Sequence, residues 1–372
     1  MADPPEPKKL FVAATKQDEG KTTLSLGLMA AFHELCPPVG FIKPVGQRYV
    51  ELDGVRVDED VALMRAVFGF EGNLKDMNPV TVGRTFTRDY ILDPKREELV
   101  DQIQRAFQAV CGGKEAVVIE GTGHAGVGSV FDLSNADVAK LLGAKVLLVT
   151  SGGIGRPIDE VMLNQSLFRQ EGVEMIGVVL NKVRPDKLDS VATFVEEGLA
   201  RKNIELLGVI PHEDILANPS MRQILDEMGG DLLNGESYLG NEVETVVVGA
   251  MTAHRALDYI YRNSLLITPG DREDLILAAM SSCAVQMDKS NCVAGMLLTG
   301  GVRPQENIMR LIRRTQIPVV LVKGDSYATA SAVNKLQVKI QPVDKKKIVM
   351  ARRLVRRFVN VDRVLELLDG GK

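Results

Sequence analysis

The sequence predicts an α/β fold, with a doubly wound parallel sheet built around a P-loop and a second, smaller parallel α/β domain after it. Three observations predict this class. Short apolar runs alternate with helical patterns along most of the chain, as they do in parallel sheets joined by crossover helices. A polar loop ending in Gly-Lys-Thr separates the first apolar run from the first helical pattern. The alternation starts afresh near residue 243, which indicates a second sheet.

The length and composition favour a soluble protein of two domains. The chain has 372 residues, of which 45% are apolar and 25% are charged, values that are ordinary for globular proteins. Its formal net charge of −4 offers no general attraction for nucleic acids or anionic membranes, so neither is expected as a partner. Residues 1–9 are polar and contain proline, so we expect neither a signal peptide nor a transit peptide there. The four cysteines form no C-x-x-C pair, so we expect them to be reduced in a cytoplasmic protein; they are Cys36, Cys111, Cys283 and Cys292.

The first element is an apolar strand pattern at residues 10–14, followed by a phosphate-binding loop and a helical pattern at residues 22–35. Gly20 lets the backbone approach a phosphate closely, and the amides at the helix start point at phosphate oxygens. Lys21 is expected to reach the terminal phosphates, and the Thr22 hydroxyl to ligate Mg²⁺. The alternative is a Gly-Lys-Thr that starts a helix by chance.

The second strand pattern, at residues 39–45, carries Lys43 near its end. The carboxyl ends of parallel strands face the ligand crevice of a doubly wound sheet, which would bring this lysine beside the loop. A solvated surface lysine is the alternative. Asp60 lies at the start of the helical pattern 58–65. It is a candidate oxygen ligand for Mg²⁺, although helix capping explains an acid at that place without any function.

Two later strand patterns end in polar side chains. The buried pattern at residues 116–121 ends in Glu120, a candidate for holding the metal or its water, with an ordinary strand-end acid as the alternative. His124 follows in a glycine-rich segment and either contacts a phosphate or has no such role. Asn181 ends the pattern at 175–181, where its amide could bind an adenine edge. The remaining patterns of this half are strands at 145–150 and 205–211 and helices at 158–170 and 188–202.

The phosphate loop departs from the usual glycine-rich pattern and carries an extra lysine. Thr15 stands where the first glycine is usual, and Lys16 precedes Lys21 by five positions. The resulting Lys-x-x-x-Gly-Lys-Thr resembles the deviant phosphate loop of dimeric P-loop ATPases. That resemblance implies a homodimer or higher homo-oligomer in which Lys16 acts on the nucleotide bound by the other subunit.

Residues 8–215 are similar to dethiobiotin synthetases, because five signals follow one another with that family's spacing. They are the loop 16–22, Lys-Pro-Val at 43–45, Asp60, Glu-Gly at 120–121, and residues 177–181 with 207–211 after them. The resemblance implies ATP and Mg²⁺ as cofactors. It assigns the triphosphate to Glu19, Lys21 and Thr22, Mg²⁺ to Thr22, Asp60 and Glu120, the reacting phosphate to Lys43 and the base to Asn181. With the loop residues already described, the candidate nucleotide-binding residues are Lys16, Glu19, Gly20, Lys21, Thr22, Thr23 and Asn181, and the candidate catalytic residues are Lys16, Lys21 and Lys43.

The family's Ser-Pro-His segment is replaced here by Val-Gly-Arg-Thr-Phe-Thr at residues 82–87. The resemblance therefore does not extend to diaminopelargonate, the substrate of that family.

The second half of the chain carries polar loops after two of its predicted strands, at residues 270–272 and 299–301. No nucleophile, base and orienting residue can be grouped there, so binding or regulation is favoured over catalysis. This half resembles the DRTGG domain, whose signature ends as residues 297–301 do. The predicted domains are 1–215, 216–345 and a helical extension at 346–372.

The two halves together resemble the N-terminal region of long phosphate acetyltransferases. The chain stops before the catalytic domain of those enzymes, so acetyl transfer is not expected.

The segment at residues 345–363 is rich in lysine and arginine. Apolar residues recur within it at helical spacing, so the charges are interpreted as the solvated face of a packed helix. Binding of nucleic acid or lipid is the alternative. The apolar positions are Ile348, Ala351, Val355 and Phe358.

Three functions remain open at this stage. The first is a regulatory or switch-type Mg-ATPase whose nucleotide state is coupled to the second domain and an unknown small-molecule or protein partner. The second is an ATP-dependent ligase that phosphorylates a carboxylate or carbamate of a small metabolite. The third is an interaction module with a decayed nucleotide site.

Overall fold

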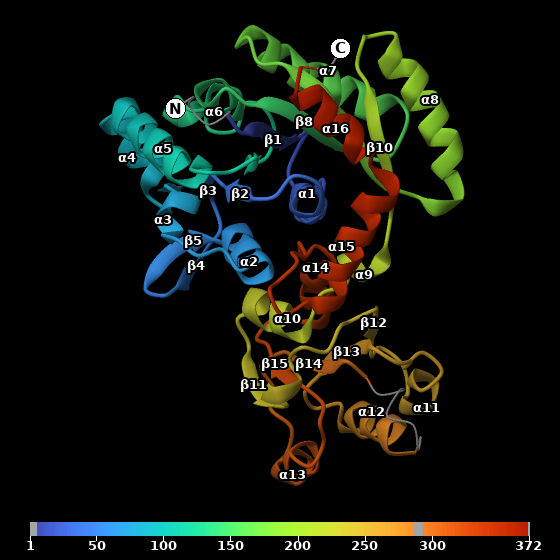
Figure 1. The fold of residues 1–372 in the computed structure, drawn as a ribbon. Helices are drawn as coiled ribbons and strands as arrows, with labels where there is room; N and C mark the ends of the chain where they lie inside the picture. Colours follow the sequence, from blue (N-terminus) through green and yellow to red (C-terminus); the bar gives the residue numbers. More distant parts are fainter. Residues whose placement is uncertain (1–5, 286–292, 371–372) are drawn as a thin grey trace. The chain divides into compact units, whose positions relative to one another are not determined.

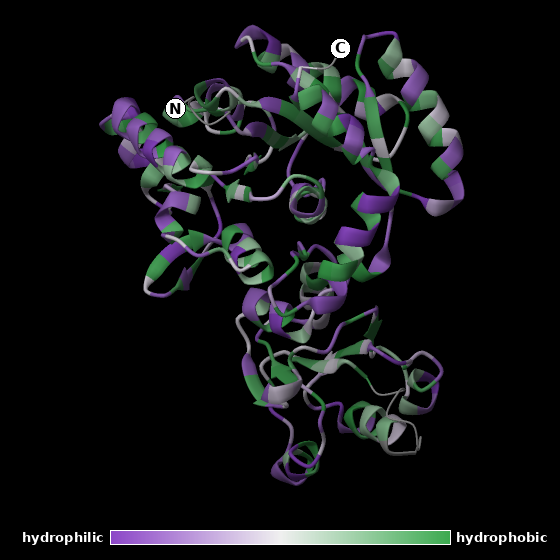
Figure 2. Ribbon diagram, in the orientation of Figure 1, coloured by the Kyte–Doolittle hydropathy of each residue, from purple (hydrophilic) through white to green (hydrophobic). Residues whose placement is uncertain are grey.

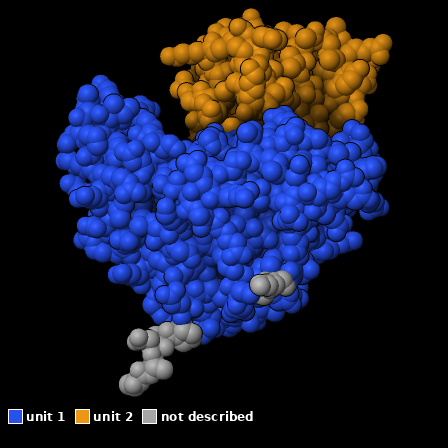
Figure 3. Space-filling view, turned by 90° about the horizontal axis from the view of Figure 1, so that it is seen from above, with its two compact units in different colours: residues 1–213, 340–372 blue, residues 214–339 orange. Residues whose placement is uncertain are grey.

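The computed structural model describes residues 6–285 and 293–370. The chain forms two compact units (Figure 3): unit 1 comprises residues 1–213 and 340–372, and unit 2 comprises residues 214–339. The division lies close to the boundary expected at residue 215. The segment 346–372 does not stand apart as an extension, because it belongs to unit 1. Unit 2 therefore interrupts unit 1 in the sequence.

Unit 1 is organised around a six-stranded sheet made of β1 (Lys8–Ala14), β2 (Val39–Ile42), β7 (Ala116–Glu120), β8 (Lys145–Ser151), β9 (Met175–Val183) and β10 (Leu206–Pro211). The spatial order is β10-β9-β8-β1-β7-β2, and every neighbouring pair is parallel. The strands are nearly continuous apolar runs because helices bury both faces of the sheet. Figure 2 shows these strands in the green of hydrophobic residues.

Helices cover the two faces of this sheet (Figure 1). One face packs in a core cluster with α5 (Arg96–Cys111), α6 (Asn135–Leu142), α7 (Gly155–Gln170) and α8 (Leu188–Ala200). The strands also contact α1 (Lys21–Leu35), α15 (Lys345–Phe358) and α16 (Val361–Leu368). The described residues of these three helices lie outside that cluster, so they cover the opposite face.

Helices α1 and α15 approach each other closely. A Cβ built on Gly27 of α1 would lie 2.2 Å from Cγ2 of Val355 in α15, so only glycine fits there without a shift. Ile348, Ala351 and Val355 are buried, as the helical spacing predicts, and most of the arginines of α15 are exposed. Among the basic residues of α15, Lys347 differs from these arginines, because its side chain is fully buried. The strongly basic segment is thus a helix packed in the unit, with its arginine side chains outward.

A small subdomain lies between β2 and β7 in the sequence. It contains β3 (Val45–Gly46) paired with β6 (Val80–Thr81), the hairpin of β4 (Tyr49–Leu52) and β5 (Val55–Asp58), and α2 (Glu59–Phe68), α3 (Leu74–Met77) and α4 (Phe86–Leu92). Asp58 is the N-cap of α2, and its side chain accepts a hydrogen bond from the amide of Asp60 at 3.0 Å. This cap fixes the first turn of α2 and with it the position of Asp60.

Unit 2 carries a five-stranded sheet made of β11 (Asp231–Asn234), β12 (Thr245–Val248), β13 (Ser264–Pro269), β14 (Gly295–Thr299) and β15 (Val319–Leu321), in the order β11-β15-β14-β13-β12. The four later strands are parallel, as expected. The edge strand β11 is antiparallel to β15, which corrects the expectation of a wholly parallel second sheet. The helices are α9 (Asp214–Ala217), α10 (Met221–Met228), α11 (Ala253–Ala256), α12 (Glu273–Val285), α13 (Glu306–Ile312) and α14 (Ser326–Asn334).

The direction of β11 has a simple reason. Helix α10 ends at Gly229, which has a φ of +59°, and the chain enters β11 directly. A parallel direction is imposed by a crossover helix between two strands, and β11 comes before the first such unit of this sheet. Three short 3₁₀ helices complete the secondary structure of both units: Ser129–Phe131, Pro185–Lys187 and Glu236–Tyr238.

The cysteines differ from expectation at one position. Cys283, in α12, is disulfide-bonded, so the prediction of four reduced cysteines is wrong for this residue. Cys36 and Cys111 are free, and burial raises the pKa of the Cys111 thiol to about 11. Cys292 lies outside the described residues. The prediction rested on sequence spacing, which does not report the distance between two cysteines in the fold.

None of the helices in the described ranges combines the length and the apolar character needed to cross a membrane.

Candidate functional site

The candidate site begins at the loop between β1 and α1, in the middle of the sheet of unit 1. Gly20 has a φ of +93°, a left-handed conformation that favours glycine, and it precedes α1 directly. A Cβ at this position would lie 2.0 Å from Nδ2 of Asn181. Any larger residue would therefore both strain the loop and displace a neighbouring side chain.

Asn181, at the carboxyl end of β9, holds the loop backbone. Its Nδ2 donates a hydrogen bond to the carbonyl oxygen of Glu19 at 2.8 Å, and its Oδ1 accepts one from the amide of Lys182 at 2.9 Å. The side chain is buried. The structure thus places Asn181 beside the loop and gives it a supporting role there. Its expected recognition of a base stays a prediction.

Thr15, which replaces the usual first glycine, is buried and makes polar contacts that a glycine could not make. Its Oγ1 donates toward Oγ1 of Thr150 at 3.0 Å and Oε2 of Glu160 at 3.1 Å. Lys16 follows, with Nζ 3.0 Å from Oε1 of the buried Glu19 and 3.5 Å from Oε1 of Glu160. The loop is therefore tied to β8 and α7 through side chains at its first two positions.

The carboxylate of Glu160 is kept charged by these neighbours. Burial would raise its pKa, but hydrogen bonds from Arg156 and Thr15 and the charge of Lys16 outweigh burial and lower it. Lys16 is accordingly paired within its own chain. Its expected action across a subunit interface stays a prediction.

Thr22, Asp60 and Glu120 converge, although they come from three separate elements. Oγ1 of Thr22 at the start of α1 lies 2.9 Å from Oδ1 of Asp60 in α2 and 3.1 Å from Oε1 of Glu120 at the end of β7. Asp60 and Glu120 are both buried. The Thr22 hydroxyl is thus within hydrogen-bond distance of both carboxylates predicted as Mg²⁺ ligands.

Lys43 lies in the centre of the acidic side chains and is itself buried. Its Nζ is 3.0 Å from Oδ1 of Asp58 and 3.6 Å from Oε1 of Glu120, and it forms a closer ion pair with Oδ2 of Asp60. Burial alone would lower the pKa of Lys43, but these three carboxylates raise it well above its ordinary value. The lysine is therefore a fixed positive charge.

The Glu120 carboxyl has a pKa well above its ordinary value. Burial and the neighbouring charge of Asp60 raise its pKa to about 7, against the opposing charge of Lys43. Its Oε2 is buried and, in the described part of the chain, has no hydrogen-bond partner within 3.5 Å, although the nearby Ser25 hydroxyl also opposes the rise in pKa. A buried carboxylate oxygen of this kind is open to a proton or a cation.

Lys21 lies close enough to this cluster to sense its charges. Burial is the main cause that lowers its pKa, and the charge of Lys43 adds to it, whereas Glu120 and Asp60 act in the opposite direction. Thr23 follows Thr22 in α1 and is half-buried. The loop residues and the acidic cluster are thus parts of one site.

Sequence reasoning missed two supporting residues. Asp58 contacts Lys43 and also accepts hydrogen bonds from the amides of Gln47 at 3.0 Å and Arg48 at 3.3 Å. Asn78 donates to the carbonyl of Lys43 at 2.8 Å and accepts from the amide of Asp58 at 2.9 Å. The acidic residues at positions 58–60 could have indicated Asp58. No sequence pattern indicated Asn78, because its role depends on the tertiary fold.

Two other predicted segments stay outside the cluster. His124 is exposed, and its Nδ1 accepts a hydrogen bond from the amide of Gly126 at 3.2 Å. In the segment 82–87, Phe86 packs against Phe131 with ring centroids 5.5 Å apart. The structure gives neither of them a contact with the acidic cluster.

The residues present suit a nucleotide with Mg²⁺ better than a permanently bound metal. No group of three or more His, Cys, Asp or Glu side chains arranged to hold a metal occurs among the described residues. Mg²⁺ usually takes one or two protein carboxylates and completes its shell with water and phosphate oxygens. The protein would therefore need to supply only a few oxygen ligands, and this site offers the carboxylates of Asp60 and Glu120 and the hydroxyl of Thr22.

Comparison with known proteins covers both halves of the chain. A family model described as an AAA domain matches residues 8–220, and one described as a DRTGG domain matches residues 223–336. The phosphate acetyltransferase of Nitratidesulfovibrio vulgaris is 28% identical over 360 residues, which are 94% of this chain and 50% of that protein. The phosphate acetyltransferase of Pseudomonas putida is 31% identical over 353 residues, which are 90% of this chain and 48% of that protein. The chain spans about half the length of these relatives.

Solved structures show a weaker likeness. The MinC:MinD cell division protein complex of Aquifex aeolicus aligns with a TM-score of 0.36 at 16% identity, over 56% of this chain and 83% of that one. A likeness at this level carries no argument about activity or assembly.

Proposed function

Since this chain belongs to the AAA domain family through residues 8–220, we propose that unit 1 binds Mg-ATP and that its nucleotide state is coupled to unit 2, the DRTGG domain. The single observation that supports this most is the convergence of Thr22, Asp60 and Glu120 at the end of the phosphate loop. These residues would hold Mg²⁺, which when bound supplies positive charge to the terminal phosphates.

The loop would bind the phosphates through its backbone and through Lys21. Gly20 keeps the loop backbone accessible, Asn181 holds its Glu19 carbonyl, and the amides at the start of α1 face the anion. Burial lowers the pKa of Lys21 below its ordinary value. The negative charge of a bound phosphate would raise this pKa again. Binding is therefore expected to hold this side chain in its charged form.

Hydrolysis would rest on positioning and charge neutralisation. Lys43 is a fixed cation beside Asp60 and Glu120. Its charge reduces the repulsion between these two buried carboxylates and between them and a bound phosphate. Without a bound cation the pKa of Glu120 is about 7; Mg²⁺ on this carboxylate would lower it, so Glu120 would act as a metal ligand that positions the ion beside the phosphates. Lys16 would add its charge from the second subunit of a dimer.

The presence of a DRTGG domain in the same chain favours a switch over a metabolic enzyme. No substrate-binding residue of the family's Ser-Pro-His type is present at 82–87. The acetyltransferase activity named for the relatives belongs to proteins about twice as long, so it is not part of the proposal.

The test is phosphate release from Mg-ATP by the full chain, with Lys21→Ala and the exposed Lys202→Ala as a matched pair. Release without any added metabolite, abolished by Lys21→Ala only, is the expected result. Hydrogen exchange at residues 264–269 and 295–299 should then differ between the ATP and ADP states. Release only with an added carboxylate or carbamate would favour the ligase, and absence of binding at millimolar ATP would leave the interaction module.

A further inference from the structure

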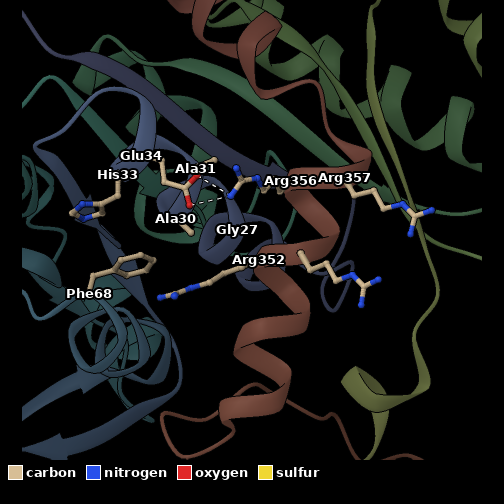
Figure 4. Close-up of a pocket in the computed structure, with 10 residues that line it drawn as sticks. Gly27, Ala30, Ala31, His33, Glu34, Phe68, Arg352, Arg356 and Arg357 are labelled. Atoms are coloured by element: carbon tan, nitrogen blue, oxygen red, sulfur yellow. Dashed lines mark hydrogen bonds and ion pairs between the residues drawn. The ribbon is translucent and has the colours of Figure 1, made fainter.

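A second groove of unit 1 lies on the far part of α1, away from the phosphate loop (Figure 4). Its cavity volume is about 590 Å³, within the range of small-ligand pockets. Its walls are the middle and end of α1, the end of α2 and the outer side of α15. The lining residues are Gly27, Ala30, Ala31, His33, Glu34, Phe68, Arg352, Arg353, Arg356 and Arg357.

The groove is strongly basic. Four arginines of α15 line it, at Arg352, Arg353, Arg356 and Arg357, and Glu34 is the one acid in the lining. Glu34 forms an ion pair with Arg356 at 3.0 Å, shown by the dashed lines in Figure 4. The lining therefore carries an excess of positive charge in a chain whose formal net charge is −4.

Two nitrogen atoms in the lining are buried without a hydrogen-bond partner, among the residues that the structure describes: Nε of Arg352 and Nε2 of His33. Arg352 lies over the ring of Phe68 at 5.2 Å from the centroid, and His33 stacks on the same ring at 5.4 Å with planes 3° apart. Phe68 thus holds both polar groups in place. Nε of Arg352 can only donate, so it lacks an acceptor, whereas Nε2 of His33 can donate or accept a hydrogen bond according to its tautomer.

From these observations we infer that the groove binds a small polyanion with two or more phosphate groups. Guanidinium groups bind phosphate through paired hydrogen bonds, and Arg352 and Arg356, on successive turns of α15, both extend toward the side of α1 and Phe68 (Figure 4) and suit a chain of phosphates. Arg357 points away, with its guanidinium over Phe358 at 5.1 Å. The groove is separate from the phosphate loop but shares α1 with it, since Lys21 and Thr22 begin the helix that Gly27 to Glu34 continue. This inference does not depend on the proposed function.

Tripolyphosphate is a suitable probe, and the chain should carry Lys21→Ala so that the phosphate loop does not compete. Calorimetric titration should show one bound tripolyphosphate per chain. Replacing the exposed pair Arg353→Gln and Arg356→Gln should weaken its affinity at least about tenfold, since two charged hydrogen-bond donors are lost. The matched pair Arg201→Gln and Lys202→Gln, also exposed in unit 1, should change the affinity less than about twofold.

Glu34→Gln provides a test in the opposite direction. It removes the competing carboxylate and frees Arg356, so the affinity for tripolyphosphate should rise several-fold. An unfolded variant could not give that result. Histidine NMR adds a local readout, because the chain has 4 histidines and His33→Gln identifies the relevant signal. The His33 resonance should move on titration while that of His254 stays in place.

The inference is overturned if tripolyphosphate does not bind the Lys21→Ala chain at millimolar concentration. Equal affinities in the groove variants and the matched pair would also overturn it. So would binding of a single-stranded RNA oligonucleotide by a chain that does not bind tripolyphosphate, since a nucleic-acid surface would then explain the arginines.

Discussion

Oγ1 of Thr22 lies 3.1 Å from Oε1 of Glu120, although 98 residues separate the two in the sequence. The contact joins the start of the phosphate-loop helix to the end of the neighbouring strand β7. It is this contact, with Asp60 beside it, that turns a loop motif into a candidate Mg²⁺ site. Each part of the cluster can be tested separately.

Thr22→Val should lower the affinity for Mg-ATP about tenfold or more, because it removes one oxygen ligand while keeping the size of the side chain. Thr22→Ser keeps the hydroxyl and should retain most of the affinity. Calorimetric titration with ATP, with and without Mg²⁺, measures both. If Thr22→Val binds Mg-ATP as tightly as the unchanged chain, the hydroxyl is not a metal ligand.

Lys43→Met should destabilise the fold by about 3–5 kcal/mol at pH 7, because it leaves three buried carboxylates without their cation. The loss should shrink toward acidic pH, where the carboxylates are protonated. Urea unfolding at several pH values measures it, with the exposed Lys75→Met as the control. An equal loss at all pH values would mean that packing, and not charge, is what Lys43 contributes.

Glu120→Gln should stabilise the fold at neutral and higher pH while abolishing hydrolysis. The pKa of Glu120 is raised from 4.5 to about 7, so the folded state binds more protons than the unfolded state between these values. Its contribution to stability is therefore greatest at low pH and is lost as the pH rises through that window.

The difference in unfolding free energy between Glu120→Gln and the unchanged chain should accordingly grow from pH 5 to pH 8. Glu115→Gln, at an exposed position just before the same strand, should show no such trend. A pH-independent difference for Glu120→Gln would contradict the raised pKa.

Asn181→Ala should separate support of the loop from recognition of a base. Loss of its hydrogen bond to the Glu19 carbonyl should weaken ATP and GTP binding alike, by roughly fivefold to tenfold for one buried hydrogen bond. A loss confined to ATP would indicate that the amide also reads the adenine edge. Competition of both nucleotides against a fluorescent analogue distinguishes the two outcomes.

A mixture of Lys16→Ala and Lys21→Ala chains should regain hydrolysis if Lys16 acts across a dimer. Each hybrid dimer then has one complete site, so a 1:1 mixture should reach about a quarter of the unchanged rate. Lys16 is paired with Glu19 and Glu160 of its own chain, and it would have to leave them to act on the partner. An inactive mixture, with dimers verified by light scattering, would leave Lys16 as a support of its own loop.

The sequence predicted the parallel sheet of unit 1 well, because the apolar pattern of each strand agrees with its buried position in the fold. Strands β1, β2, β7 and β9 are apolar runs that end within two residues of Thr15, Lys43, Glu120 and Asn181, respectively, so one rule about the ends of parallel strands located most of the candidate site. Asn78 and the Thr15 contacts with Thr150 and Glu160 escaped, because they depend on side-chain distances that no spacing encodes.

In unit 2 the alternation predicted the four parallel strands but missed β11, which lies in the segment interpreted as a junction and is antiparallel to β15. The basic groove was missed as well. The arginines of α15 were recognised as one face of a helix, while Phe68 and His33 reach that face from distant parts of the chain.

The close approach of Gly27 to Val355 has a consequence for how the protein is made. The helix that carries Lys21 and Thr22 packs against a helix that follows unit 2 in the sequence, so a ribosome must translate unit 2 before α1 can be covered. We expect the phosphate-loop unit to mature late during synthesis, with unit 2 free to fold first. A fragment cut at residue 215 would leave the α15-facing side of α1 bare, so we expect it to be prone to aggregation.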